Sequence, residues 1–213
     1  MTLTEVLAAG RAPTRLLLVT PSPINAPDRL HPEAELAQIN AALEEARVGV
    51  DIVRLTPPTV SNLRRALATS QFDVVHVAAH SGHGVEFEDD DGTAIMISED
   101  EFTELFAGCG TCLLVLNGCS TERLADRLVR ASPNITTISV AGNIPRRDAL
   151  RAIDEIYGLL FTRISPVEVA QIASNAVRRR MPSRSSGAPI QARGRRVGSP
   201  LFDVGTGTGR PTY

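Results

Sequence analysis

Two stretches, FDVVHVAAH (residues 72–80) and CLLVLNGC (residues 112–119), decide the fold expected for this chain. Each contains a short run of β-branched and aliphatic residues, which is typical of a strand buried on both faces. The first run leads into His80 and the second into Cys119. If the two strands are parallel neighbours, their carboxyl ends meet at one edge of the sheet, where open α/β sheets bind ligands. An imidazole and a thiol at that edge are candidates for a general base and a nucleophile.

The segments on either side alternate between strand and helix patterns. This alternation predicts an α/β fold, a three-layer sandwich with a mostly parallel central sheet and helices on both faces. Strands are expected at residues 15–20, 50–55, 72–79, 112–117 and 135–140. Helices are expected at 32–47, after a cap at Ser61, after a Ser98–Glu101 capping box, and at 122–131, 148–163 and 167–181.

Length and composition predict one globular domain with a tail. The 213 residues are 43% hydrophobic and their mean hydropathy is near zero, which suits a single domain with its own core. We assign residues 14–182 to this domain and residues 1–13 to an N-terminal extension. Residues 183–213 are rich in Arg, Gly and Ser, and we expect them to form a disordered tail.

The same composition predicts a cytoplasmic protein without a membrane or nucleic-acid partner. Its apolar runs are shorter than the ~18–20 residues that cross a bilayer, and Met1–Gly10 lacks the basic segment of a secretory signal. Three cysteines, an odd number, do not form a disulfide framework, and reduced thiols suit the cytoplasm. The tail has five arginines and one aspartate but no interleaved aromatic residues, which favours a solvated tail over a nucleic-acid site.

The turns after the two central strands favour catalysis over a purely structural role. The small residues after His80 leave backbone N–H groups free to stabilise an oxyanion, and Ser81 and Gly82 are the candidates. Cys119 lies in a similar turn at the start of a predicted helix, whose N-terminus favours the thiolate. His76 is expected to lie beneath His80 in the core. We expect no metal, because His76 and His80 are four residues apart on a strand. That separation is ~13 Å, which is too far for both to bind one ion.

Two further patterns have alternative interpretations. Cys109 and Cys112 match the C-x-x-C redox spacing, but they precede a strand where a redox pair would open a helix, so we expect no redox site and no cofactor. Two short β segments, 85–87 and 95–97, flank residues 88–92 and predict a hairpin, and the acidic residues are Glu86 and Glu88–Asp91. We interpret these acids as a solvated hairpin tip. The alternative is a pocket for a basic side chain.

Five segments in this order resemble the CHAT family, caspase-like cysteine peptidases related to caspases, separases and gingipains. The similarity spans residues 14–181. The segments are RLLLVTPSP with the following PEAELAQI, FDVVHVAAHSG, VEFEDDDG, CLLVLNGCST and IYGLLFTRISPVEVAQIASNAVRRR. The resemblance implies a catalytic His80 and a nucleophilic Cys119. The family pattern has glycine where this chain has Ser81, and His83-Gly84 spells the expected pair three residues later.

The resemblance implies an endopeptidase that cleaves a protein substrate when a separate sensor or partner activates it. The alternative is a catalytically inactive pseudoprotease of the same family that acts as a protein-interaction module. Ser81 leaves that alternative open, because a β-carbon restricts the positive-φ conformations that glycine adopts. A third interpretation, a nucleotide-binding domain, lacks a phosphate loop after the first strand, where Pro21 and Pro23 stand.

Overall fold

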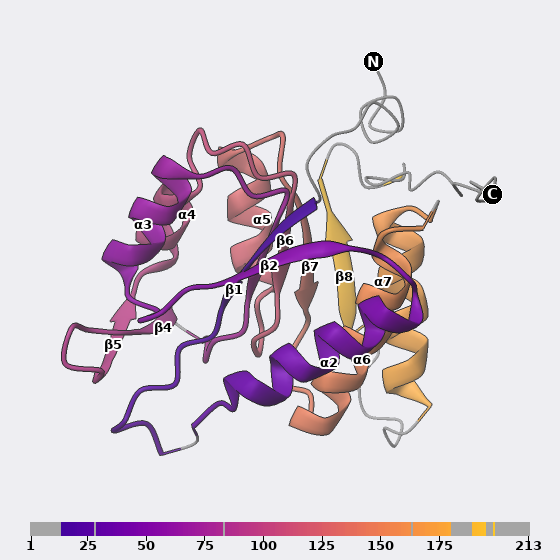
Figure 1. Ribbon diagram of the computed structural model, residues 1–213, viewed down its shortest axis with the longest axis horizontal. Coiled ribbons are helices and arrows are strands. Elements are labelled where there is room, and N and C mark those ends of the chain that lie inside the picture. Colours follow the sequence, from indigo (N-terminus) through magenta and orange to yellow (C-terminus); the bar gives the residue numbers. More distant parts are fainter. Residues whose placement is uncertain are drawn as a thin grey trace, which may run out of the picture.

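The computed structural model describes residues 14–27, 29–82, 84–162, 164–179, 189–194 and 198. Within these residues, six strands form a central sheet in the order β2-β1-β3-β6-β7-β8, and two more form a separate hairpin (Figure 1). Neighbouring strands of the central sheet are parallel except that β8 is antiparallel to β7. The strands are β1 (Thr14–Val19), β2 (Val50–Arg54), β3 (Val74–Val77), β4 (Val85–Glu88), β5 (Ala94–Ile97), β6 (Leu113–Leu116), β7 (Thr136–Val140) and β8 (Ile190–Arg193).

Helices cover both faces of the central sheet, as the alternating pattern predicted. Figure 1 shows α2, α6 and α7 on one face and α3, α4 and α5 on the other. Among the described residues, no helix has both the length and the apolar character that crossing a bilayer requires. The helices are α2 (Pro32–Glu45), α3 (Val60–Thr69), α4 (Glu99–Leu105), α5 (Glu122–Ala131), α6 (Arg146–Leu160) and α7 (Pro166–Arg178).

The strands β1, β3 and β6 are mostly apolar because each contributes to two separate cores. Leu16 and Leu18 of β1 contact the core beneath α2, α6 and α7. Leu17 and Val19 point to the opposite face and contact the core beneath α3, α4 and α5. All four side chains are buried. Because side chains alternate between the faces of a strand, only an uninterrupted apolar run can fill both cores.

The helix caps confirm one sequence prediction and correct another. Ser98 and Glu101 form the predicted capping box at the start of α4. The predicted cap of α3 is wrong: the cap is Thr59, whose Oγ1 accepts a hydrogen bond of 3.2 Å from the Asn62 N–H. A cap needs extended backbone before the first turn, which Thr59 has, whereas Ser61 already lies within the helix.

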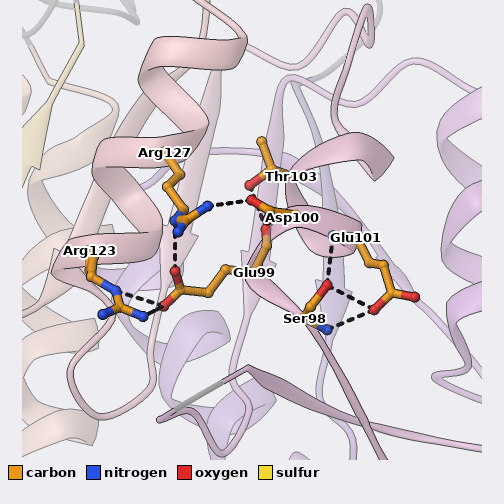
Figure 2. Close-up of polar contacts among 7 residues, drawn as sticks. All are labelled: Ser98, Glu99, Asp100, Glu101, Thr103, Arg123 and Arg127. Atoms are coloured by element: carbon orange, nitrogen blue, oxygen red, sulfur yellow. Dashed lines mark hydrogen bonds and ion pairs between the residues drawn. The ribbon is translucent and has the colours of Figure 1, made fainter.

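Ion pairs hold α4 against α5. Figure 2 shows Arg123 and Arg127 of α5 reaching toward Glu99 and Asp100 of α4. The Glu99 carboxylate lies 3.2 Å from Arg123 Nη2 and 2.8 Å from Arg127 Nε, and Arg127 also pairs with Asp100. Glu99 is largely shielded from water, so screening weakens these pairs less than it weakens fully exposed pairs. They fix the start of α5, the helix that follows the turn containing Cys119.

The disorder predicted from residue 183 onward is wrong for Ile190–Arg193, which form β8 at the edge of the central sheet. Ile190 is buried, and its backbone N–H and C=O both hydrogen-bond the Ser174 hydroxyl of α7, at 2.9 and 2.8 Å. Arg193 pairs with Asp126 of α5 at 2.5 Å. The composition of the tail did not indicate this short strand, because the surrounding residues include many Gly, Pro and Ser. Residues 1–13, and the tail apart from 189–194 and 198, lie outside the described residues.

Candidate functional site

The ends of β3 and β6 carry the two candidate catalytic residues to the same edge of the sheet. The two strands are parallel neighbours, with Val77 opposite Leu116. The ladder continues beyond the strands, because the Asn117 N–H donates to the Val77 carbonyl at 2.8 Å. His80 and Cys119 each follow three residues later, in the turns after the two strands, and both line the same cavity. The two residues therefore lie at the same edge of the sheet.

Gly118 allows the turn that contains Cys119 to approach the turn that contains His80. A β-carbon at Gly118 would lie 2.4 Å from the Ala79 carbonyl oxygen and 2.8 Å from Ser81 Oγ, closer than real contacts allow. The Ser81 hydroxyl uses this proximity to donate a hydrogen bond to the Cys119 carbonyl. The serine that departs from the family pattern therefore ties the two turns together.

The backbone after Cys119 adopts an uncommon conformation. Ser120 has φ of +54°, in the left-handed region that few residues other than glycine occupy. Its N–H donates to the Gly142 carbonyl at 2.9 Å, and the Thr121 N–H donates to the Val140 carbonyl at 2.9 Å. These bonds hold the tight turn between β6 and α5. Backbone strain that the surrounding structure maintains is concentrated at functional sites in proteins.

A cavity of about 670 Å³ opens above the two strand ends. Its floor includes Ala79, His80 and residues 117–119. One wall comes from residues 26, 27 and 29–31 before α2, including Arg29 and His31, and the other from Ile144, Arg146 and Ala149 around the start of α6. The cavity is in the size range of small-molecule and side-chain pockets. None of the described residues that line it is acidic.

The acidic residues 86–91 do not line this cavity. They belong to the β4–β5 hairpin, which confirms the predicted hairpin. Asp89 accepts hydrogen bonds from the Thr93 hydroxyl and N–H, and these bonds lower the pKa of the Asp89 carboxyl. Glu88 accepts a bond of 2.7 Å from the Ser22 N–H. These carboxylates therefore stabilise the hairpin and the loop beside it.

The two predicted oxyanion donors differ in their surroundings. The Gly82 N–H donates to the Gly84 carbonyl at 3.3 Å, so it is already engaged. The N–H groups of Ser81 and Cys119 have no backbone acceptor within the part of the chain that the structure describes. His83, the alternative histidine, lies outside the described residues.

His76 lies below the site in the core, as predicted, and is fully buried. Its ring contacts Glu35 of α2 and Tyr157 of α6, and Glu35 in turn contacts Asn117. The sequence around His76 does not indicate these partners, because they come from distant helices. The one local signal was a polar Asn117 at the end of an apolar strand. The cysteines 109, 112 and 119 are all free thiols.

Comparisons with known proteins support the fold. No family model matches the sequence, and no curated protein matches it. The structure is similar to the Drosophila initiator caspase Dronc, with a TM-score of 0.57, 11% sequence identity, and coverage of 89% of this chain and 84% of that chain. At this identity the likeness concerns the fold alone. The caspase-like α/β fold predicted from the sequence is confirmed.

Proposed function

We propose that this chain is a cysteine endopeptidase of the CHAT family that uses a His80–Cys119 dyad. One observation carries the proposal: each residue follows the end of one of two adjacent parallel strands, and both line one cavity. The caspase-like fold adds support, since Dronc is a caspase. The strained turn after Cys119 adds more, because such strain accompanies function.

The chemistry would follow from these positions. Cys119 Sγ attacks the scissile carbonyl carbon after the thiol proton passes to His80, forming a tetrahedral intermediate. The N–H groups of Cys119 and Ser81 stabilise the oxyanion, a contribution that is typically about 10²–10³-fold in kcat for each donor. His80 then gives the proton to the leaving amine, and water hydrolyses the thioester. Gly82 is the less favourable second donor, because its N–H is engaged with Gly84.

The substrate would be a protein, and activation would come from a separate sensor or partner chain. The three free thiols suit the reducing cytoplasm, where we place the protein. The reaction needs no metal or cofactor, because the thiol and the imidazole supply the nucleophile and the proton transfer. The competing hypothesis is an inactive interaction module, which keeps the fold and lacks the reaction.

Alanine variants at the two positions test the proposal. We expect Cys119→Ala to abolish cleavage of a diverse peptide library, and His80→Ala to lower kcat by about 10²–10⁴-fold because general base catalysis is lost. Mass spectrometry of the peptides measures cleavage, and labelling with a thiol-directed peptidyl probe measures the nucleophile directly. Both measurements are made with and without candidate partner proteins, and thermal melting verifies that each variant folds.

Two matched controls sharpen the result. The double variant Cys109→Ala/Cys112→Ala removes the thiols that do not line the cavity and should keep full activity. His83→Ala should keep most activity, and a loss equal to that of His80→Ala would assign the base to the other histidine. Full activity of Cys119→Ala would rule out the dyad, and an inert wild-type protein with every candidate partner would favour the interaction module.

A further inference from the structure

A chain of four hydrogen-bonded side chains runs from the core to the floor of the cavity. Tyr157 Oη lies 3.0 Å from His76 Nδ1, and His76 Nε2 lies 2.9 Å from Glu35 Oε1. The same Glu35 oxygen accepts a bond of 2.5 Å from Asn117 Nδ2. Tyr157 and His76 are fully buried and Glu35 is 7% exposed. Asn117 is the member that lines the cavity.

One set of donors and acceptors satisfies all four side chains. Glu35 Oε1 accepts from Asn117 Nδ2–H and, in this arrangement, also from His76 Nε2–H. His76 Nδ1 then accepts from the Tyr157 hydroxyl, so every group in the chain has a partner. Burial, with the negative charge of Glu35 adding to it, raises the pKa of the Tyr157 hydroxyl well above its ordinary value. The tyrosine therefore remains a donor.

Burying the carboxyl group of Glu35 at this depth is costly. A buried charge destabilises a protein unless hydrogen bonds compensate it, and apolar residues of similar size often stabilise a core equally well. Stability alone therefore gives little reason for these four residues. Their position gives another reason, because they join α2, β3, α6 and the end of β6 at one point. Both walls of the cavity are formed by segments around the starts of α2 and α6.

The last member of the chain is close to the candidate nucleophile. Asn117 precedes Cys119 by two residues, and its backbone N–H is bonded to the Val77 carbonyl. The intervening Gly118 packs against the Ala79 carbonyl, where no β-carbon fits. Asn117 is thus held at its side chain by Glu35 and at its backbone by β3. A change in its side-chain bond therefore reaches the turn that carries Cys119 through only two peptide units.

We propose that Tyr157, His76, Glu35 and Asn117 form a positioning network that sets the alignment of the Cys119 thiol with His80. None of the four acts on the substrate in this proposal. The effect on kcat that it predicts rests on the proposed peptidase function. A misplacement of about 1 Å in an active site can lower the rate about 10²-fold. The network therefore controls kcat from a tyrosine that is outside the cavity lining.

The test uses Tyr157→Phe and Glu35→Gln in a chain whose other cysteines, Cys109 and Cys112, are replaced by serine. Tyr157→Phe keeps the ring and removes one hydroxyl, and Glu35→Gln keeps the shape and removes the charge. We expect each to lower kcat about 10–100-fold with KM little changed. Each should also slow alkylation of the single thiol by iodoacetamide several-fold, since a displaced His80 no longer activates it.

Ser174→Ala is the matched control. Ser174 is fully buried and its hydroxyl makes two hydrogen bonds to Ile190, so its loss should lower the melting temperature by a similar amount. It should leave both kcat and the alkylation rate unchanged. If Tyr157→Phe and Glu35→Gln behave like Ser174→Ala in both rates, the positioning role is ruled out.

The two measurements separate this inference from the proposed function. If the wild-type protein cleaves no peptide and the network variants still slow alkylation relative to Ser174→Ala, the peptidase proposal fails and the network stands. If the wild-type protein is active and the variants match the control, the network fails and the peptidase stands. Both substitutions are conservative, so we expect each variant to fold. A melting curve verifies this before the rates are compared.

Discussion

At the scale of single residues, Ser81 has two opposing interpretations. As a replacement for the glycine of the family pattern, it would impair the site by restricting the backbone. In the structure its hydroxyl donates to the Cys119 carbonyl and joins the two turns of the candidate site. The contact favours a supporting role, and the two interpretations predict opposite effects of restoring glycine.

We therefore expect both Ser81→Gly and Ser81→Ala to lower the rate of peptide cleavage by several-fold to about 10-fold. The reason is the lost hydrogen bond, whose net value is about 0.5–1.5 kcal/mol. Steady-state kinetics on one cleavable peptide measure the effect, and Ser81→Ala controls for the backbone freedom that glycine adds. A rate that rises in Ser81→Gly would show that the serine impairs the site.

The candidate catalytic pair was predictable from sequence, whereas its supporting residues were not. His80 and Cys119 each follow a short, fully buried and largely apolar strand, so their place at the sheet edge follows from the strand pattern. The helical pattern of α6 places Tyr157 on the apolar face, but it does not indicate that its hydroxyl contacts His76. The pattern of α2 places the acids, Glu35 among them, on the solvent-facing side. Both residues contact His76, which is 41 residues from Glu35 and 81 residues from Tyr157 in the chain. No local pattern carries that information.

At the scale of elements, helix starts depend on one backbone conformation more than on residue type. Ser61 and Thr59 are both good capping residues, and the prediction from sequence took Ser61, which is not the cap. Thr59 has the extended backbone of a cap and accepts from the Asn62 N–H, whereas Ser61 lies in the first turn of α3. The Ser165–Glu168 capping box of α7 has the same spacing as the Ser98–Glu101 box of α4, so that signal was present in the sequence.

We expect Thr59→Ala to lower the free energy of unfolding by about 1–2 kcal/mol, because it leaves the Asn62 N–H without its acceptor. Ser61→Ala should change it by less than about 0.5 kcal/mol, since Ser61 is exposed and alanine favours the helix interior. Urea denaturation of the two variants and the wild-type protein measures both values. Equal losses would mean that both residues cap the helix, and a larger loss for Ser61→Ala would reverse the assignment.

At the scale of the whole molecule, the central strands were predictable from the sequence because they are buried on both faces. The strand at the edge of the sheet was not predictable. β1, β3 and β6 fill two cores at once, so their sequences contain almost nothing but apolar residues. β8 lies at the edge, and only Ile190 among its residues is fully buried. One buried residue in a polar segment produces no periodicity, and the antiparallel pairing with β7 arises from tertiary contacts. The boundary of the domain therefore lies beyond residue 182.

The substitution Ile→Ala, made at two positions with opposite burial, tests whether β8 is part of the folded unit. Ile190 is 2% exposed and Ile24 is 66% exposed. We expect Ile190→Ala to lower the free energy of unfolding by about 2–5 kcal/mol, through lost burial and the cavity that remains. Ile24→Ala should change it by no more than about 0.5 kcal/mol. Urea denaturation compares the two, and a loss at Ile190 as small as that at Ile24 would mean that the sheet ends at β7 in solution.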